Sequence, residues 1–432
     1  MFGRNFKKLL PLADRGPLRV MFIHTEVVVG GAETLLLEII RKMDRNRFQP
    51  ELCCLKQLAE LGEVISHEIP TFAGLLKNKY DAGVIVRLAK LLKERRIDAI
   101  VTVGTGGDRM FWGRLAAYRA GVPVILSALH ATGYPMKVER LNRLLSPITD
   151  GFIGCAKTHS QYLIDGEGCP AKKVFTVWNG VDVDRFRPRD KATMRDRIGI
   201  PLDKPAVGIV AALRPEKQHV MLIEAWSKVV KRLPDAVLVV VGDGVERSTI
   251  ENKTRELGLE NHVRMLGMRS DVPEVLAGLD LKVLSSKMEA NPASTLEANA
   301  CGLPVVAPDV GSLSDTVEHG VTGLLYKADD PIALADSILE ILLKKDRGLS
   351  MGEAARDLVC RKFSLDVMVK GYENLIEGIY KAAGRGSRLS PRAFDELMED
   401  FLSSKLQQGI AGAIIQEDYP GLNPGIESCK NS

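Results

Sequence analysis

One rhythm occurs twice along this chain, and it constrains the fold more than any other feature. Short apolar segments rich in β-branched residues alternate with longer amphipathic segments. Near-continuous apolar strands separated by helices are typical of a parallel sheet that is buried on both faces. The first set of expected strands covers residues 18–24, 51–55, 97–103, 122–126, 151–155 and 173–178.

A polar segment with several prolines, residues 185–205, interrupts this rhythm, which then restarts. We therefore expect two tandem α/β domains of the doubly wound, Rossmann-like type, at residues 18–184 and 206–363. Residues 185–205 are the expected linker, with a short helix inside. A length of 432 residues suits two domains of ordinary size. The second set of expected strands covers residues 206–213, 236–242, 263–267, 279–286, 303–308 and 322–326.

Three further segments flank these domains. Residues 1–17 are an N-terminal extension, and residues 364–382 read as a helix that closes the compact part. Residues 383–432 are a tail that we expect to be partly disordered, with one amphipathic stretch at 391–406. Because ligands bind beyond the carboxyl ends of parallel strands, the cleft between the two domains is the expected site.

Charge and cysteine content exclude several classes of protein. The net charge of +4 is small for this length, which argues against nucleic acid as a partner. Seven scattered cysteines without a C-x-x-C pair favour reduced thiols in the cytoplasm over a disulfide framework or a zinc site. No apolar run reaches the roughly 18 residues that a membrane helix needs, and the first residues are too weakly apolar for a secretory signal.

The stretch MEANPASTLEANACGLP, residues 288–304, sets Glu289 and Glu297 eight positions apart. Between them, Asn291 and Pro292 read as an N-cap followed by the first residue of a helix. Glu289 should then lie on a loop and Glu297 on the helix. The unpaired N–H groups at a helix start form an anion site, and here they belong to Ala293, Ser294 and Thr295. The expected order is carboxylate, anion site, carboxylate.

Two other strand ends carry candidate groups. Gly30 and Gly31 follow the first strand and open a helix, where their backbone amides could approach a phosphate. A simple turn is an equally good reading. The G-x-G-x-x-G dinucleotide fingerprint is absent, which disfavours nicotinamide chemistry. His130 follows the fourth expected strand and could face the cleft, although a lone histidine is more often structural.

Arg214 and Lys217 follow the first strand of the second domain, at the expected start of a helix. Cations there oppose the helix dipole, which suggests that a bound anion offsets the cost. One cation about 4 Å from a phosphate oxygen is worth roughly 4 kcal/mol at an effective dielectric of 20, before desolvation. The alternative is that both side chains are simply solvated.

With Glu289, seven residues, Glu297 and then ANACGLPVVAPDVGS, the sequence resembles the retaining glycosyltransferases of family four, which have the GT-B fold. The resemblance extends from Gly30 to the closing helix and covers roughly residues 18–382. It implies metal-independent transfer of a sugar from a UDP- or GDP-linked donor bound mainly by the second domain. It also implies that the closing helix crosses back to the first domain.

The resemblance assigns roles to named residues. Lys217 and Arg214 would hold the diphosphate, Glu297 would accept hydrogen bonds from the ribose, and Glu289 would lie beside the transferred sugar. The family usually has glycine, an apolar residue and proline after the first glutamate, whereas this chain has EANP, so the sugar pocket differs. The implied catalytic residues are His130, Arg214, Lys217 and Glu289, and the implied donor contacts are Gly30, Gly31, Arg214, Lys217, Met268, Asn291, Ala293, Ser294, Leu296 and Glu297.

The resemblance implies a glycan, lipid-linked or small-molecule acceptor, as in polysaccharide biosynthesis. Residues 75–96 carry seven Lys or Arg against two Asp or Glu, and residues 1–12 set apolar and basic side chains at helical spacing. Both segments could rest on the inner face of an anionic membrane, or could simply be solvated. A nucleotide-sugar epimerase and a non-catalytic nucleotide-sugar binder are the alternative functions.

Overall fold

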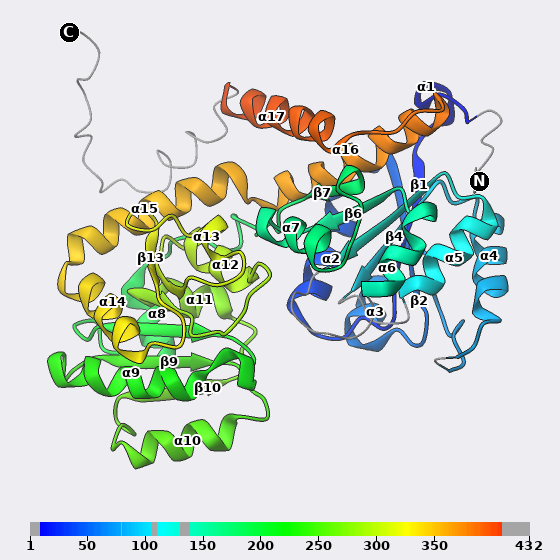
Figure 1. Ribbon diagram of the computed structural model, residues 1–432. Coiled ribbons are helices and arrows are strands. Elements are labelled where there is room, and N and C mark those ends of the chain that lie inside the picture. The colour runs from blue at the N-terminus through cyan, green and yellow to red at the C-terminus, as the bar shows by residue number, and fades with distance from the viewer. Residues whose placement is uncertain (1–8, 79, 105–109, 130–138, 408–432) are drawn as a thin grey trace, which may run out of the picture.

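The computed structural model describes residues 9–78, 80–104, 110–129 and 139–407, which fold into two α/β domains (Figure 1). The first domain has a parallel seven-stranded sheet in the order β3-β2-β1-β4-β5-β6-β7. Its strands are β1 (Leu18–His24), β2 (Phe48–Cys54), β3 (Thr71–Ala73), β4 (Ala99–Gly104), β5 (Val124–Leu129), β6 (Gly151–Gly154) and β7 (Val174–Thr176).

The second domain has a parallel six-stranded sheet in the order β10-β9-β8-β11-β12-β13. The two doubly wound domains expected from the apolar rhythm are therefore confirmed. Edge strand β3 was not predicted, because a three-residue segment that is only partly buried leaves no apolar run to recognise. The strands of the second domain are β8 (Ala206–Val210), β9 (Val237–Val241), β10 (Val263–Gly267), β11 (Leu281–Val283), β12 (Val305–Pro308) and β13 (Gly323–Tyr326).

Helices cover both faces of each sheet, and each sheet is the middle of a layered core. In the first domain they are α1 (Leu12–Arg15), α2 (Gly31–Lys42), α3 (Ala59–Ser66), α4 (Val84–Glu94), α5 (Met110–Ala120), α6 (Glu139–Leu145) and α7 (Lys157–Asp165), with short 3-10 turns η1 (Ser146–Ile148) and η2 (Ala171–Lys173). In the second they are α8 (Lys191–Ile198), η3 (Pro215–Lys217), α9 (His219–Arg232), α10 (Arg247–Glu256), α11 (Val272–Ala277), α12 (Ala293–Ala300), α13 (Leu313–Thr316), α14 (Pro331–Leu343) and α15 (Lys345–Lys362).

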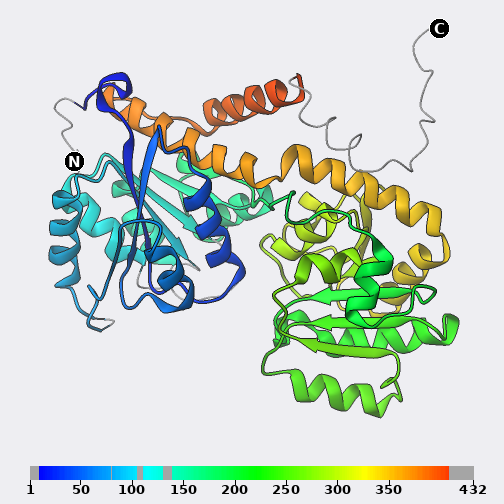
Figure 2. The same ribbon diagram turned by 180° about the vertical axis from the view of Figure 1, so that it is seen from behind.

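The chain crosses between the domains twice, and the two crossings lie side by side. Val181 pairs with Ser364 in an isolated parallel bridge, and the amide of Leu365 donates to the carbonyl oxygen of Val181 at 2.8 Å. From there α16 (Leu365–Gly384) returns to the first domain, as Figure 2 shows, and buries one face in its core. Among the described residues, no helix is long and apolar enough to cross a membrane.

A second C-terminal helix, α17 (Pro391–Gln407), packs on the same side of the first domain. The ring of Phe394 is fully buried and meets Phe175 of β7 edge to face, with centroids 5.7 Å apart. The amphipathic stretch expected at residues 391–406 therefore forms a helix. It belongs to the ordered body of the first domain rather than to a loose tail.

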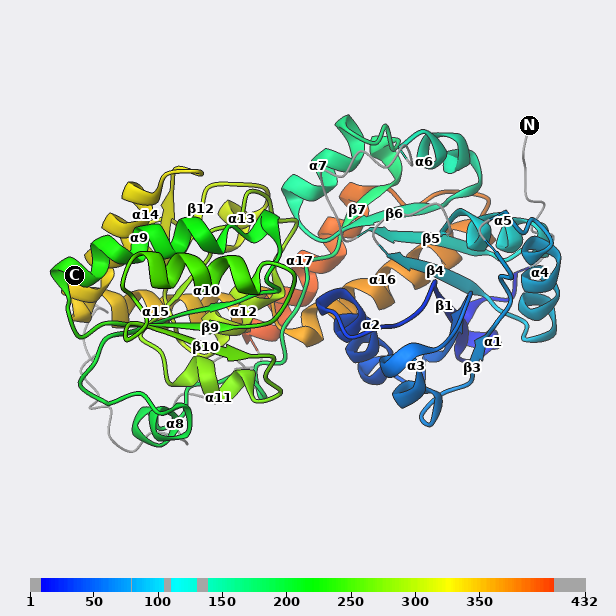
Figure 3. The same cartoon turned by 90° about the horizontal axis from the view of Figure 1, so that it is seen from below.

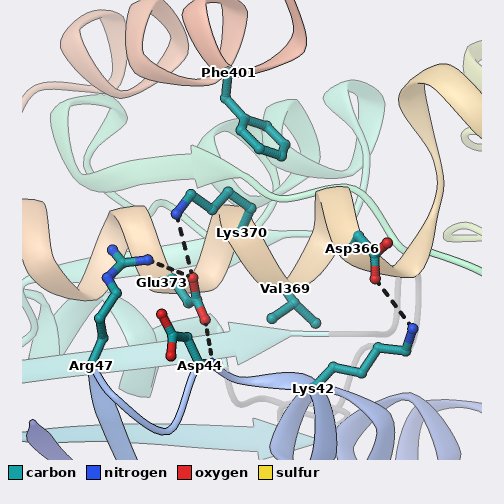
Figure 4. A pocket seen from close by; sticks show the side chains of 8 residues that line it. All are labelled: Lys42, Asp44, Arg47, Asp366, Val369, Lys370, Glu373 and Phe401. Carbon is teal, nitrogen blue, oxygen red and sulfur yellow. Dashed lines mark hydrogen bonds and ion pairs between the residues drawn. The ribbon is translucent and has the colours of Figure 1, made fainter. Parts of the chain in front are cut away.

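Ion pairs hold α16 against the first domain around a pocket shown in Figure 4. The buried carboxylate of Glu373 accepts a hydrogen bond from the amide of Asp44 at 2.8 Å and pairs with Arg47 at 2.8 Å and Lys370 at 3.6 Å. At the other end of the pocket Lys42 pairs with Asp366 at 3.2 Å. These interactions join α16 to residues 42–47 of the first domain. The pocket therefore lies at a structural contact that holds the helix in place.

Replacing Glu373 by Gln should lower the thermal stability of the protein. The neutral side chain still accepts a hydrogen bond from the Asp44 amide, but it loses the charge interactions with Arg47 and Lys370. For a buried charged group, such a loss lowers the free energy of unfolding by about 1–3 kcal/mol. That corresponds to a fall in Tm of roughly 2–4 °C per kcal/mol, readable by differential scanning fluorimetry. The matched control is E396Q, whose partner Arg392 is 89% exposed, and it should leave Tm unchanged. Equal Tm values for both variants would contradict this account.

Candidate active site

The strand order of the second sheet reverses between β8 and β11, which lie side by side although β9 and β10 separate them in sequence. A crevice opens at such a point because the loops that leave the two strands go to opposite faces. Two hydrogen bonds join these loops. Ser285 Oγ donates to the carbonyl oxygen of Lys217 at 2.7 Å, and the amide of Lys287 donates to that of Glu216 at 2.9 Å.

An ion pair lies at this junction. Lys217 Nζ is 2.6 Å from Glu289 Oε1, and the Ser286 hydroxyl donates to the same oxygen at 2.6 Å. Glu289 is buried, so its charge depends on these donors. The structure thus brings together two of the predicted site residues, 72 positions apart in sequence.

Arg214 does not join this pair. Its side chain is 66% exposed, and it lies 4.0 Å from Glu216 Oε1. It precedes η3, so the short turn that brings Lys217 inward leaves Arg214 on the open side. The two cations predicted to act together therefore occupy different environments.

Helix α12 begins at Ala293, one residue later than predicted, and Pro292 occupies the cap position. The prediction that Asn291 caps this helix is wrong, because its side chain makes a different contact. Asn291 Nδ2 donates to the carbonyl oxygen of Cys155 at 2.8 Å, and Asn179 Nδ2 donates to the carbonyl oxygen of Asn291 at 3.0 Å. Both bonds join the two domains, so α12 starts at their boundary.

The start of α12 keeps part of the predicted anion site. The amide of Thr295 donates to the carbonyl oxygen of Pro292 at 3.0 Å and is therefore not free, as the sequence had suggested. The amides of Ala293 and Ser294 have no hydrogen-bond partner among the described residues. Figure 3 shows α12 on the side of the second domain that faces α2 of the first.

Glu297 lies one turn further along α12. Burial raises its pKa from 4.5 to about 6, and the positive charges of Lys282 and Arg185 oppose this rise. At neutral pH the carboxylate is therefore mostly ionised and can accept hydrogen bonds from a hydroxyl pair. Its neighbour Leu296 is fully buried in the core of the second domain, which leaves only its backbone for the donor contact that the resemblance implied.

The first domain contributes the loop between β1 and α2. Gly30 precedes α2 and Gly31 is its first residue, as predicted. A Cβ atom on Gly30 would lie 2.3 Å from the carboxylate of Glu33, whereas one on Gly31 would meet nothing within 4 Å. His24, at the end of β1, is 3.7 Å from Glu33; burial lowers the pKa of the imidazole, and Glu33 opposes that shift. Sequence reasoning missed both of these groups.

One predicted residue lies apart from this geometry, and the position of another is not described. Met268 follows β10, which two strands separate from β11, and the residue is 73% exposed. His130 lies outside the described residues. No group of three or more His, Cys, Asp or Glu side chains in the described part of the chain could hold a metal ion.

The loop before α13 fixes the backbone of Glu289, which sequence reasoning also missed. Gly311 has φ +56°, and a Cβ atom there would lie 1.9 Å from the carbonyl oxygen of Glu289. The amide of Ser312 donates to that oxygen at 3.2 Å, and its hydroxyl donates to the carbonyl oxygen of Ala290. Only the glycine in PDVGS signals such an approach, and glycine alone does not identify what approaches.

Replacing Gly311 by Ala should destabilise the protein more than the same change at Gly320. Both glycines have positive φ, so both variants carry the strain of about 1–2 kcal/mol for an L-residue in that region. Only at position 311 does the added methyl overlap a backbone atom, since nothing lies within 4 Å at position 320. Thermal unfolding of the two variants separates the backbone strain, which both share, from the steric overlap at position 311. An equal fall in Tm would show that no overlap exists.

Replacing Glu297 by Gln should change how stability depends on pH. A carboxyl whose pKa is higher in the folded than in the unfolded protein stabilises the fold below pH 4.5 and loses that contribution as pH rises through about 6. The amide cannot ionise, so the Tm of E297Q minus that of the wild type should increase between pH 4.5 and pH 7. Denaturation curves across this range measure the difference, and a constant difference would contradict the raised pKa.

Comparison with known proteins agrees with this geometry. The profile of the family Glycosyl transferases group 1 matches residues 190–358, and that of Glycosyltransferase Family 4 matches residues 29–185. The N-acetyl-alpha-D-glucosaminyl L-malate synthase of Bacillus anthracis is 32% identical over 301 residues, which are 68% of this chain and 78% of that protein.

A relative with a longer match is the UDP-Gal:alpha-D-GlcNAc-diphosphoundecaprenol alpha-1,3-galactosyltransferase of Escherichia coli, 23% identical over 81% of this chain and 94% of its own. Among solved structures, that of Anabaena Alr3699/HepE in complex with UDP superposes with a TM-score of 0.74 at 21% identity, and covers 83% of this chain and 100% of that one. The chain therefore belongs to glycosyltransferase family four, the group one glycosyl transferases, and has their GT-B fold.

Proposed function

We propose that this glycosyltransferase transfers a hexose, with retention of configuration, from a UDP-linked sugar to a glycan, lipid-linked or small-molecule acceptor. The observation that carries the proposal is the Lys217–Glu289 ion pair at the point where the strand order reverses, beside the free amides of α12. A cation, two amides and two carboxylates within one crevice match a ligand that is anionic in the middle and hydroxylated at both ends.

The diphosphate would take the cations and the helix amides. Lys217 would exchange its bond with Glu289 for a phosphate oxygen, which keeps the ammonium paired and leaves Glu289 free for a sugar hydroxyl. The amides of Ala293 and Ser294 add donors at the positive end of α12. The exposed side chain of Arg214 is free to swing onto the same phosphates, and Gly31 would meet them from the first domain.

Both ends of the donor would meet further residues in this arrangement. Glu297 would accept hydrogen bonds from the ribose hydroxyls, and Met268 would approach the base. Glu289 would orient the transferred hexose next to the first domain, where His130 would face the reacting carbon. The glycine-free sequence EANP places Ala290 and Asn291 at the sugar end, and Asn291 is already committed to the domain boundary.

The reaction we propose needs no bound metal. The C–O bond between the sugar and the diphosphate breaks while the acceptor oxygen forms its bond to the same carbon on the same face. The acceptor's proton passes to the leaving diphosphate oxygen, so the diphosphate itself is the base. Lys217 and the α12 amides stabilise the negative charge that grows on the leaving group, which is the kind of contribution that preorganised donors make in enzymes.

The choice of a UDP-linked donor follows two relatives. The name of the Escherichia coli relative gives UDP-Gal as its donor, and the superposed Anabaena protein was solved with UDP. A GDP-linked sugar is the alternative that the family resemblance leaves. We place the acceptor against the first domain, where three cations of the basic segment 75–96 are held in ion pairs, namely Arg87 with Asp81, Lys90 with Glu94 and Arg95 with Glu51.

We place the enzyme in the cytoplasm, with contact to an anionic membrane as a secondary expectation. Six of the seven cysteines lie in the described part of the chain, and none of these six forms a disulfide there; five of them are buried. Reduced thiols of this kind suit a reducing compartment. Ion pairs of three of the seven cations in residues 75–96 reduce the charge that this segment offers to a membrane surface, so vesicle flotation with anionic lipid should show weak binding that salt abolishes.

Replacing Lys217 by Ala should lower the turnover of the donor by on the order of a hundredfold or more, the usual scale for the loss of one charge-stabilising donor. Slow hydrolysis with water as acceptor, measured as nucleotide release, makes the assay independent of the unknown acceptor. A preceding thermal-shift screen over nucleotide sugars selects the donor, because a ligand at 100 times its Kd adds about 2.7 kcal/mol of stability.

Lys231→Ala is the matched control, since Lys231 is an exposed lysine on α9 of the same domain. It should keep the wild-type rate. Wild-type turnover in a folded Lys217→Ala variant would refute the role of this cation. Ring inversion of the donor without an acceptor would instead identify an epimerase, and binding without transfer or hydrolysis would identify a non-catalytic binder.

A further inference from the structure

Lys282 is the middle residue of β11, the strand that leads to Glu289. Its neighbours Leu281 and Val283 both belong to the core cluster on one face of the sheet. Because side chains alternate along a strand, Lys282 points to the opposite face, where α12 packs. A lysine in an otherwise apolar parallel strand is rare, since lysine is almost never fully buried without a partner.

This lysine is fully buried, and its ammonium has no hydrogen-bond partner among the described residues. The residues beside it in the sheet, Gly208 and Val305, carry no charge. Thr295 and Asn299 on α12 are also fully buried polar side chains with unpartnered atoms in the described part of the chain. Polar groups therefore continue from the crevice into the layer beneath it.

Three charged groups act on Lys282 from the elements around it. Glu289 on the loop after β11 and Glu297 on α12 attract its ammonium, while Lys217 after β8 repels it. Burial lowers the pKa of Lys282 to about 7, and the two carboxylates oppose that shift. The influence is mutual, because Lys282 is the main charge that opposes the rise in the pKa of Glu297, ahead of Arg185.

We propose that Lys282 is a positioning residue for the donor: its buried ammonium, unpartnered among the described residues, in the strand that leads to Glu289 and on the face where α12 packs, supplies the positive charge that orients the carboxylates of Glu289 and Glu297 toward the hydroxyls of a sugar nucleotide. This inference rests on the proposed function, and it adds a residue that does not touch the donor. Lys217 leaves Glu289 when it binds phosphate, whereas Lys282 stays in its strand. It therefore supplies the positive charge that the two carboxylates retain in the complex.

The pH dependence of donor affinity in the wild-type protein tests this role. UDP-glucose and GDP-mannose are the probes, measured by isothermal titration calorimetry from pH 5 to pH 9. Their diphosphates are substituted at both ends and lack the group of pKa about 6 found in a phosphate monoester. Affinity should weaken below about pH 6, as Glu297 gains a proton, and above about pH 7, as Lys282 loses one.

The variant Lys282→Met removes the charge and keeps a long apolar side chain that suits the core. Without the ammonium, the carboxyl group of Glu297 should hold its proton to a higher pH. The acidic limb of the affinity profile should move upward, affinity at pH 7 should fall severalfold, and the alkaline limb should disappear. Lys231→Met is the matched control and should keep the wild-type profile.

Each result bears on one of the two proposals. A Lys282→Met profile identical to that of the wild type overturns the role of Lys282. Should this variant not fold, a wild-type affinity that stays constant from pH 6 to pH 9 overturns it as well. The absence of wild-type binding to any nucleotide sugar at any pH instead overturns the proposed function, from which this inference starts.

Discussion

The contact between Lys217 and Glu289 is the interaction on which the architecture of the site depends. It joins the loops that leave β8 and β11, two strands adjacent in the sheet but separated by more than 70 residues of chain. Hydrogen bonds from the Ser285 hydroxyl and the Lys287 amide to backbone carbonyl oxygens hold the same loops in register. Because these hydrogen bonds already fix the backbone beneath the ion pair, the two side chains are held close together by the fold.

Buried charge has a second consequence in this domain. Lys282 is fully buried and burial also raises the pKa of Glu297, so the protonation of each depends on the other. Glu297 has a raised pKa and Lys282 a lowered one, and each shift would be larger without the other. An arrangement of this kind is costly for stability but gives a ligand fixed charges that need no reorganisation on binding.

Sequence patterns were sufficient for the fold and for part of the site. β1 and β10 have the bounds that their apolar runs predicted. Edge strand β3 lacks such a run. Lys217 and Glu289 follow strands and could be placed together because parallel strands end at one edge. Whether Arg214 joins them depends on a single 3-10 turn, which no periodicity reveals.

The features that sequence patterns did not reveal share one physical cause. They depend on contacts with backbone atoms or with residues far away in the chain. Asn291 is a residue type that commonly caps helices, yet its side-chain amide donates a hydrogen bond to a carbonyl oxygen of the other domain instead. Gly311 is required by a carbonyl oxygen 22 residues earlier in the chain. Lys282 was visible as a charge in an apolar strand, but its meaning depends on two carboxylates that only the fold brings near.

The paired crossings at Val181 and Ser364 have a mechanical consequence. Two chain segments that bridge the domains at the same point act as one pivot, whereas widely spaced connections would lock the halves together. A Cβ atom on Gly180 would lie 2.8 Å from the Cα of Leu365, so this pivot has almost no clearance. A rotation of a few degrees there is amplified by the length of each lobe, and the far edges of the crevice travel much further than the residues that turn.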